Sequence, residues 1–342
     1  MGSILHQTTV VRDGMHNGFT DLQYWQGAYW VSYRKGAGHT SMDAHAVVSV
    51  SHDRSRFTEI ATASVKGDVR DPKLLPIDDD KMAMYFPSWL EGAGTLKSDG
   101  QVTRKPLQQY ITFSNNGYDW QPAQPILDPW MWLWRVRKHD GKYFGLIQNL
   151  GSRCHGDRRP HQLDLAVSDD LINWEVIARV GDGLNESDIY WHADGEAWIV
   201  SRTVDPAVGS VFASSKPPYT DWQTIDMKPL VHAPIMLEHE GEIFVAGRSN
   251  PDSEGLTDTP FNGSGLSVWR VTSGKLESVL RIPATGDCSY PGLIKDPDGR
   301  ICMSYYSQHA YHLGVIPRRE PTPNMEHPGG ADDVYFAQIE LP

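Results

Sequence analysis

The segment SDDLINW, residues 168–174, combines a Ser-x-Asp turn with a tryptophan four positions after the second aspartate. Three related segments occur in the chain, the third of them looser: Ser51-His52-Asp53…Phe57, Ser114-Asn115-Asn116-Gly117…Trp120 and Ser214-Ser215-Lys216…Trp222. Ser and Asp side chains bind turn amides, and the aromatic ring packs between neighbouring sheets. The aromatic residues are 63, 54 and 48 positions apart. A repeat of this size in a strand-rich chain predicts the blades of a β-propeller.

Composition supports an all-β class. The chain has 342 residues, 39% of them hydrophobic, with 12 Trp, 31 Gly and 23 Pro. Short β-rich runs are broken by Gly, Asp, Asn and Pro from end to end, and long segments with a 3.6-residue period are missing. The length is sufficient for a large core. We expect residues 1–342 to form a single propeller domain.

Charge and motifs exclude several functional classes. A net charge of −12 argues against nucleic acid or an anionic membrane as partner. No run of 18 apolar residues is present, and the first residues, MGSILHQTTVVRDG, lack a signal-peptide pattern, so we expect a cytoplasmic protein or a secreted one whose signal has been removed. Cys154, Cys288 and Cys302 show no CxxC spacing. We therefore expect no metal, no cofactor and no disulfide framework, and the oligomeric state stays open.

Tight polar turns set the register of the blades. Six of them separate apolar runs: Gln26-Gly27, Asp79-Asp80, Asp140-Gly141, Asp194-Gly195, Glu240-Gly241 and Asp298-Gly299. Such dipeptides are strong hairpin signals. Each turn is expected to join the first and second strands of one blade, which predicts six blades.

The two strands of each hairpin place defined residues on one face of the propeller. The first strands line the axis, so residues eight positions before the turns should surround its mouth: Gly18, Asp71, Trp132, Glu186, His232 and Tyr290. Residues eight positions after the turns should lie beside them: Arg34, Pro87, Gln148, Arg202, Arg248 and Tyr306. Glu186 and Arg202 are therefore expected to be neighbours. Arg34, Arg202 and Arg248 occupy equivalent positions in blades one, four and five, at the end of the second strand.

Ring closure is also predicted. Val334–Leu341 has the character of a third strand of blade six, whose fourth strand is missing at the C-terminus. Thr8-Thr9-Val10-Val11 near the N-terminus can supply that strand, which would seal the ring and cover its edges.

Six blades with Ser-x-Asp turns and a Glu…Arg…Arg…Tyr order resemble the sialidase superfamily of glycoside hydrolases. The resemblance matches Glu186 and Arg202 to the family's glutamate and second arginine, and Arg248 to its third arginine. Ser289-Tyr290-Pro291-Gly292-Leu293-Ile294…Asp298-Gly299-Arg300 is similar to the segment with the tyrosine nucleophile. Asp43 lies between the second and third strands of blade one, where the family has its acid/base aspartate.

The resemblance implies hydrolysis of a terminal, acidic sugar from glycans. A carboxylate on the anomeric carbon repels an anionic nucleophile, whereas a neutral phenol avoids this repulsion. Because an unperturbed tyrosine has a pKa near 10, Tyr290 needs Glu186 as a base. Arginines bind the carboxylate through paired hydrogen bonds. Asp43 would protonate the leaving oxygen and then activate water.

One motif departs from the family pattern. Sialidases begin blade one with Arg-Ile-Pro, which carries the first carboxylate-binding arginine, whereas this chain has Asn17-Gly18-Phe19-Thr20. Arg34 and Arg70 are the candidate replacements.

Three alternative functions stay open at the level of sequence. Val69-Arg70-Asp71-Pro72 resembles the Arg-Asp-Pro segment of five-bladed glycosidases acting on furanosides, with Asp71 and Glu186 as a carboxylate pair. A polysaccharide lyase acting on uronic acids would use His or Tyr, and the candidates are His39, His155, His161, His232, His309 and His312. A non-catalytic glycan-binding propeller is the third. Rim aromatics that can stack on sugars are Trp89, Trp132, Trp134, Tyr306 and Tyr311.

Overall fold

The computed structural model describes residues 1–90, 95–96, 102–103, 107–150, 161–205, 208–249, 265–312 and 330–342. These residues are nearly all in β-strands, with one short helix, α2 (His309–His312). In this part of the chain no helix has the length and hydropathy needed to cross a membrane.

The described strands form six blade sheets and one separate two-stranded sheet. Blade one contains β2 (His16–Trp25), β3 (Ala28–Gly36), β4 (His45–Ser51) and β5 (Thr58–Ala63). In blade two, β6 (Asp68–Val69) and β7 (Lys73–Asp78) both pair with β8 (Lys81–Trp89), which is followed by β11 (Leu107–Ser114) and β12 (Gln124–Ile126). The short strands β9 (Thr95–Leu96) and β10 (Val102–Thr103) pair with each other.

Blades three to six repeat the four-stranded antiparallel pattern. Blade three is β13 (Met131–His139), β14 (Lys142–Asn149), β15 (Gln162–Ser168) and β16 (Glu175–Asp182). Blade four is β17 (Leu184–Trp191), β18 (Ala197–Thr203), β19 (Ser210–Ser215) and β20 (Gln223–Met227). Blade five is β21 (Val231–His239), β22 (Glu242–Ser249), β23 (Gly265–Thr272) and β24 (Lys275–Ile282). Blade six is β25 (Cys288–Lys295), β26 (Ile301–Ser307), β27 (Asp333–Glu340) and β1 (Ser3–Val11).

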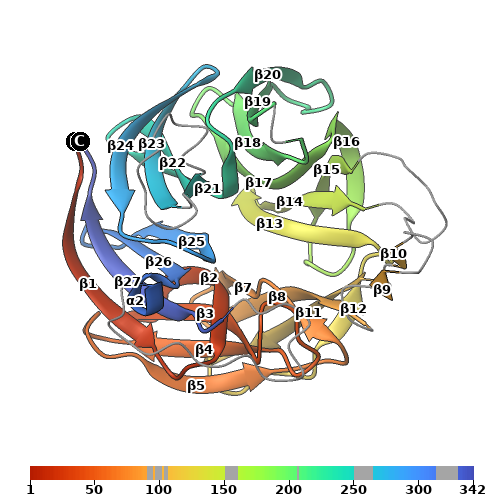
Figure 1. Cartoon of the computed structure of the whole chain (residues 1–342). Coiled ribbons are helices and arrows are strands. Elements are labelled where there is room, and N and C mark those ends of the chain that lie inside the picture. The colour runs from red at the N-terminus through yellow and green to blue at the C-terminus, as the bar shows by residue number, and fades with distance from the viewer. Residues whose placement is uncertain are drawn as a thin grey trace.

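The six blades are arranged in a ring, with β2, β7, β13, β17, β21 and β25 innermost (Figure 1). The predicted all-β, six-bladed propeller is confirmed. All six predicted polar turns connect a first strand to a second strand. Strand β1 pairs with β27 from Ser3↔Glu340 to Val11↔Val334, so the first strand of the chain is the outer strand of blade six. The assignment of the whole chain to one domain stays a prediction.

The Ser-x-Asp/Asn turns share one hydrogen-bond pattern. In blade three the Ser168 hydroxyl accepts the Leu171 amide at 2.9 Å, and Asp170 Oδ1 accepts the amides of Ile172 and Asn173 at 2.8 Å each. In three copies the residue three positions after the serine has a left-handed φ: Arg54 (65°), Gly117 (76°) and Leu171 (69°). In the looser copy the left-handed residue is Tyr219 (65°), five positions after Ser214. The turns at Ser51, Ser114 and Ser168 are therefore equivalent in structure as well as in sequence, and the looser copy shares only the left-handed residue and the tryptophan.

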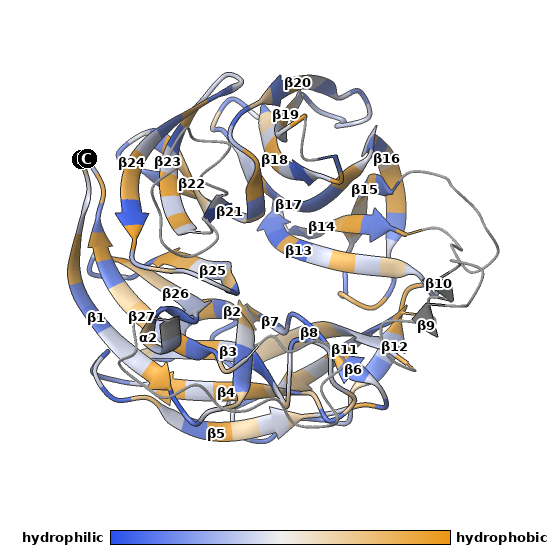
Figure 2. Ribbon diagram, in the orientation of Figure 1, coloured by the Kyte–Doolittle hydropathy of each residue, from blue (hydrophilic) through white to orange (hydrophobic). Residues whose placement is uncertain are grey.

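The core lies mainly between adjacent blades. Apolar residues recur along the strands of every blade (Figure 2). The largest group joins blades five and six and includes Phe244, Val268, Leu293, Met303 and Tyr335. Trp174 Nε1 donates to the Leu171 carbonyl at 3.0 Å, while its ring packs against a buried group that joins blades two and three. The aromatic residue of the repeat thus fixes its turn and also contributes to the core.

We expect Asp170→Ala to lower the free energy of unfolding by about 1–2 kcal/mol, because two backbone amides lose their acceptor. Asp169→Ala is the matched control: Asp169 is exposed and lies 3.7 Å from Lys142, so we expect a change within about 0.5 kcal/mol. Urea unfolding followed by tryptophan fluorescence measures both. Equal effects of the two variants would contradict the assigned role of the turn.

Candidate active site

Irregular first strands bring side chains to the centre of the ring. Five of these strands have a register shift near the start of their hairpin: Gly18/Asp21, Leu133/Arg135, Leu184/Ser187, His232/Ile235 and Ser289/Gly292. Left-handed φ angles occur there at Phe19 (58°), Ala233 (49°) and Tyr290 (47°), and between β6 and β7 at Asp71 (39°). Such bulges redirect side chains, and strained non-glycine residues concentrate at functional sites.

Glu186 is the centre of the cluster. Its Oε1 accepts a hydrogen bond from the Tyr290 hydroxyl at 2.9 Å and from Arg202 Nη1 at 2.8 Å. Its Oε2 accepts the Ala233 amide at 2.6 Å. Blades four, five and six therefore meet on one carboxylate that is only 3% exposed.

Electrostatics keep Glu186 ionised and Tyr290 neutral. Burial alone would raise the pKa of Glu186, but Arg202, Arg248 and the hydrogen bond from the Ala233 amide outweigh it and lower the pKa. Burial, Glu186 and Asp71 raise the pKa of Tyr290 well above its usual value, although Arg202 and Arg248 oppose them. The pair is therefore a phenol that donates to a carboxylate, which is the starting state for proton transfer from Tyr290 to Glu186.

Two arginines and a histidine extend the cluster toward blade six. Arg248 Nη1 donates to the Cys288 carbonyl at 3.1 Å, and its Nη2 lies 3.1 Å from His232 Nδ1. Burial, Arg248 and Arg202 lower the pKa of His232 to about 3, so the ring is neutral and its Nδ1 accepts a hydrogen bond from Arg248. The side chains of Arg202 and Arg248 are 27% and 21% exposed, which leaves donors available to a ligand.

Asp71 is a second carboxyl group of the cluster: the charge of Glu186 raises the pKa of Asp71, and Asp71 in turn raises the pKa of Tyr290. It is 3% exposed, and its Oδ2 has no hydrogen-bond partner among the described residues. Burial raises the pKa of Asp71 to about 7 against the opposing effects of Lys73 and Arg70. Buried Lys73 lies below: its Nζ donates to the Thr20 carbonyl at 3.2 Å and lies 5.7 Å from the Tyr290 ring centroid.

The expected position of Arg34 requires correction. Arg34 is fully buried and its guanidinium is bound by Asp68 (2.7 Å), the Val69 carbonyl (3.0 Å) and the Gly38 carbonyl (2.8 Å). It therefore has no donor for a substrate. Arg70 is the better replacement for the missing arginine: its side chain is 11% exposed, and its guanidinium lies 5.0 Å from the Phe19 ring centroid.

Asp43 also differs from expectation. It is exposed, and its Oδ1 accepts the Ala37 amide at 3.2 Å and the Ser41 hydroxyl. Burial would raise the pKa of Asp43, but these hydrogen bonds outweigh it and lower the pKa. Among the described residues it shares no hydrogen bond or ion pair with the cluster. Asp43 is thus a loop cap that holds its proton weakly, which does not suit a general acid.

The aromatic residues expected at the rim differ in exposure: Tyr306 is buried, whereas Trp132 is half-buried. Tyr306 is fully buried and its hydroxyl donates to Asp287 at 2.9 Å, so it supports the site and is not free to stack on a sugar. Half-buried Trp132 packs between Trp89 (6.2 Å) and Trp134 (5.4 Å), and Trp134 lies 5.6 Å from Tyr290. This row leads from the cluster across blades two and three. His155 lies outside the described residues.

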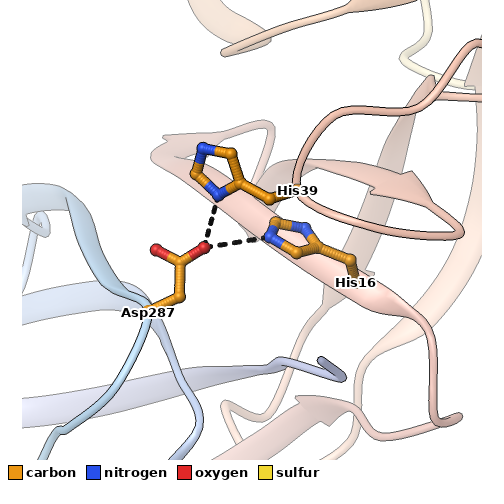
Figure 3. A group of neighbouring side chains, drawn as sticks. All are labelled: His16, His39 and Asp287. Carbon is orange, nitrogen blue, oxygen red and sulfur yellow. Dashed lines mark hydrogen bonds and ion pairs between the residues drawn. The ribbon is translucent and has the colours of Figure 1, made fainter. Parts of the chain in front are cut away.

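Sequence reasoning missed a group at the junction of blades one and six. His16, His39 and Asp287 place their nitrogen and oxygen atoms within 4.8 Å of one another (Figure 3). His39 Nδ1 is 2.5 Å and His16 Nε2 3.1 Å from Asp287 Oδ2. No motif identifies them, because the three residues are separated by long stretches of chain and only ring closure brings them together.

This donor set favours hydrogen bonding over metal ligation. Arg34 Nη1 lies 3.4 Å from His16 Nδ1 and can only donate, so Nδ1 accepts and the proton is on Nε2. Burial lowers the pKa of His16 to about 4, so the ring stays neutral. His16 Nε2 therefore points a hydrogen, not a lone pair, at Asp287 Oδ2. Asp332 Oδ2 lies 3.0 Å from the same nitrogen.

Opposite pKa shifts give opposite pH dependences of stability. The pKa of Asp71 is raised in the folded state, so its charge destabilises the fold increasingly as the pH rises from about 4 to 7. We expect Asp71→Asn to stabilise the protein at pH 8, by up to a few kcal/mol, and to match wild type at pH 4. Urea titrations at pH 4, 6 and 8 measure this difference.

Asp43→Asn is the control with the reverse sign. The lowered pKa of Asp43 contributes stability above its unfolded value, so this variant should lose a little stability at neutral pH and converge with wild type in acid. Parallel pH profiles for wild type and Asp71→Asn would show that Asp71 is ionised in the fold like an ordinary carboxyl group.

The chain matches no family model and no curated protein. Among solved structures it is similar to a protein of unknown function from Dyadobacter fermentans, with a TM-score of 0.73 and 15% identity over 100% of this chain and 99% of that one. The phage phi92 endosialidase has a TM-score of 0.65 and 9% sequence identity, over 98% of this chain and 69% of the endosialidase chain. Trypanosoma rangeli sialidase in complex with sialic acid has a TM-score of 0.63 and 10% sequence identity. The match covers 96% of this chain and 55% of the sialidase chain, so this chain spans about half the length of that sialidase. The fold is that of the sialidase-like six-bladed β-propellers.

Proposed function

We propose that the protein is a retaining glycoside hydrolase that removes a terminal acidic sugar, with Tyr290 as nucleophile and Glu186 as its base. The 2.9 Å hydrogen bond from the Tyr290 hydroxyl to Glu186 carries the proposal. A tyrosine beside an ionised, arginine-bound carboxylate at the axis is difficult to explain by packing alone. The similarity to a sialidase solved with sialic acid supports the choice of an acidic sugar.

The proposed first step forms a bond between the Tyr290 oxygen and the anomeric carbon. The phenolic proton passes to Glu186, and the glycosidic bond breaks as its oxygen receives a proton from a general acid. In the second step water attacks the anomeric carbon and the Tyr290–carbon bond breaks. Glu186 then returns its proton to the phenolate. Arg202 contributes by holding Glu186 in place at 2.8 Å.

Recognition of the sugar carboxylate is assigned to Arg70, Arg202 and Arg248. Each has a partly exposed guanidinium beside the Tyr290–Glu186 pair or beside Phe19, which packs against Tyr290 at 4.8 Å. Charge-assisted hydrogen bonds from arginines suit a carboxylate. Half-buried Trp132 would contact the apolar face of the sugar or of the next residue in the glycan, and buried Trp134 would support it from below the surface.

We expect Glu186→Gln and Tyr290→Phe each to lower kcat/KM by at least about 10³-fold on the best substrate from a panel of 4-methylumbelliferyl glycosides, beginning with sialic acid and continuing with arabinosides and uronides. Because the two residues act as a unit, the double variant should be no more impaired than the worse single one. Tyr118→Phe, at an exposed tyrosine, should retain wild-type activity.

Other outcomes would point to other functions. Normal glycan binding by both variants, with no cleavage of any substrate by wild type, would identify a binding module. An unsaturated product with new ultraviolet absorbance would identify a lyase.

We expect Arg248→Met to lower kcat/KM about 10- to 100-fold on a glycoside with a sugar carboxylate, and less than threefold on the matching neutral sugar. Arg248 touches neither Tyr290 nor Glu186 by hydrogen bond, so the chemistry itself should be retained. Arg270→Met, at an exposed pair with Glu242 on blade five, is the control. Equal losses on both sugars would remove Arg248 from carboxylate recognition.

A second candidate function rests on Asp71. Its pKa of about 7 and its unpartnered Oδ2 suit a general acid, with Glu186 as the second carboxylate of a glycosidase acting on furanosides. In that case arabinofuranosides would be the best substrates, and Tyr290→Phe would retain most of the activity while Asp71→Asn would not.

A further inference from the structure

The loop between β3 and β4 presents His39, not Asp43, to the cluster. The His39 side chain is 35% exposed, and its Nδ1 lies 2.5 Å from Asp287 Oδ2. Because a carboxylate only accepts, Nδ1 carries a proton. Figure 3 shows Nδ1 directed at Asp287 and the second ring nitrogen directed away from it. His39 Nδ1 is therefore held by Asp287, and Nε2 is available to bind a substrate atom.

Asp287 is built to stay ionised and fixed. Its Oδ1 accepts the Tyr306 hydroxyl at 2.9 Å, and Arg248 Nη1 is 3.8 Å from the same oxygen. Its Oδ2 accepts from both His39 and His16. Burial would raise the pKa of Asp287, but the hydrogen bonds from the two histidines hold it well below the usual value.

His39 and Tyr290 flank the same aromatic ring. The Phe19 ring is 5.3 Å from His39 and 4.8 Å from Tyr290, with edge-to-face geometry in both cases. Arg70 binds this group as well: its Nη1 donates to the His39 carbonyl at 2.5 Å and its guanidinium lies 5.0 Å from the Phe19 centroid. Phe19 is itself buried, so its ring fixes the positions of both groups, and the His39 side chain stays partly exposed.

We propose that His39 is the general acid/base of the reaction and that Asp287 is its positioning residue. The inference rests on the proposed hydrolase function. In the first step the Nε2–H of the His39 imidazolium passes its proton to the glycosidic oxygen as the carbon–oxygen bond breaks. In the second step neutral Nε2 takes a proton from the attacking water. Asp287 holds Nδ1–H and stabilises the imidazolium in both steps.

The groups that face His39 favour this role. Asp287 is an anion on Nδ1, and the His16 ring, 5.2 Å away, is neutral because burial lowers its pKa. Arg70 is a cation bound to the backbone carbonyl, and Arg248 is held on the far oxygen of Asp287. Burial and the neighbouring Asp287 and Asp333 raise the pKa of Asp332 well above the usual value, so it adds little charge beside His16.

The test compares two leaving groups. For His39→Ala we expect kcat/KM to fall about 10³-fold on a methyl glycoside, which needs protonation, and only about tenfold on the 4-methylumbelliferyl glycoside. His39→Gln, which can still donate to Asp287, should behave like His39→Ala. His52→Ala, at an exposed histidine of the blade-one turn, should match wild type.

Asp287→Asn separates positioning from direct catalysis. We expect a smaller loss of kcat/KM on the methyl glycoside than for His39→Ala, because His39 remains but is no longer held by a carboxylate. In ¹⁵N-histidine-labelled protein, a low-field Nδ1–H proton signal should be present in wild type and absent from both His39→Ala and Asp287→Asn. This signal does not depend on activity.

Several results would overturn the inference. If wild type cleaves no glycoside, the proposed function itself fails and the catalytic role of His39 fails with it. If wild type is active and His39→Ala keeps its rate on the methyl glycoside, this inference alone fails. The same holds if Asp71→Asn shows the leaving-group dependence instead. Loss of activity in EDTA and its return with Zn²⁺ would make His39 a metal ligand.

Discussion

The pairing of β1 with β27 is the constraint on which the arrangement depends. It joins residues as far apart in the chain as Ser3 and Glu340, and so fixes blade six against blade one. The same junction is reinforced beside the site, where Asn17 Nδ2 and the Asp332 amide bind backbone carbonyls across it. Tyr290 and Asp287 come from blade six, whereas Phe19 and His39 come from blade one. The candidate chemistry is therefore assembled only when the ring is closed.

Buried charges below the site are paired across blades. Arg135 of blade three binds Asp21 of blade one at 2.9 Å, and Arg137 binds Asp188 of blade four. Because an unpaired buried charge is costly, these pairs restrict how the first strands can shift relative to one another. The Arg135–Asp21 pair also acts on Lys73, whose pKa is lowered by burial and by Arg135 while Asp21 opposes the shift. The two ion pairs thus restrain the first strands beside the site and distribute charge over blades one, three and four.

The sequence predicted the architecture because the repeat and the turns are local signals. It also predicted that Glu186, Arg202 and Tyr290 approach one another, since all three follow from counting along hairpins. It failed for Arg34 and Tyr306, because counting gives the position of a backbone and not whether a side chain is covered. Asp43 was chosen over His39 within one loop, and only the direction of each side chain distinguishes them. Asp287 precedes its strand, so no hairpin count reaches it.

The bulges in the first strands have an evolutionary consequence. Each one turns a single residue toward the axis while the rest of its strand continues to pack against the next blade. A change in the backbone at such a position can therefore alter which side chain the centre of the ring presents, while the paired remainder of the strand stays in register. Five such positions, in blades one and three to six, allow specificity to diverge stepwise on a conserved scaffold, which is consistent with a shared fold at 9–15% identity.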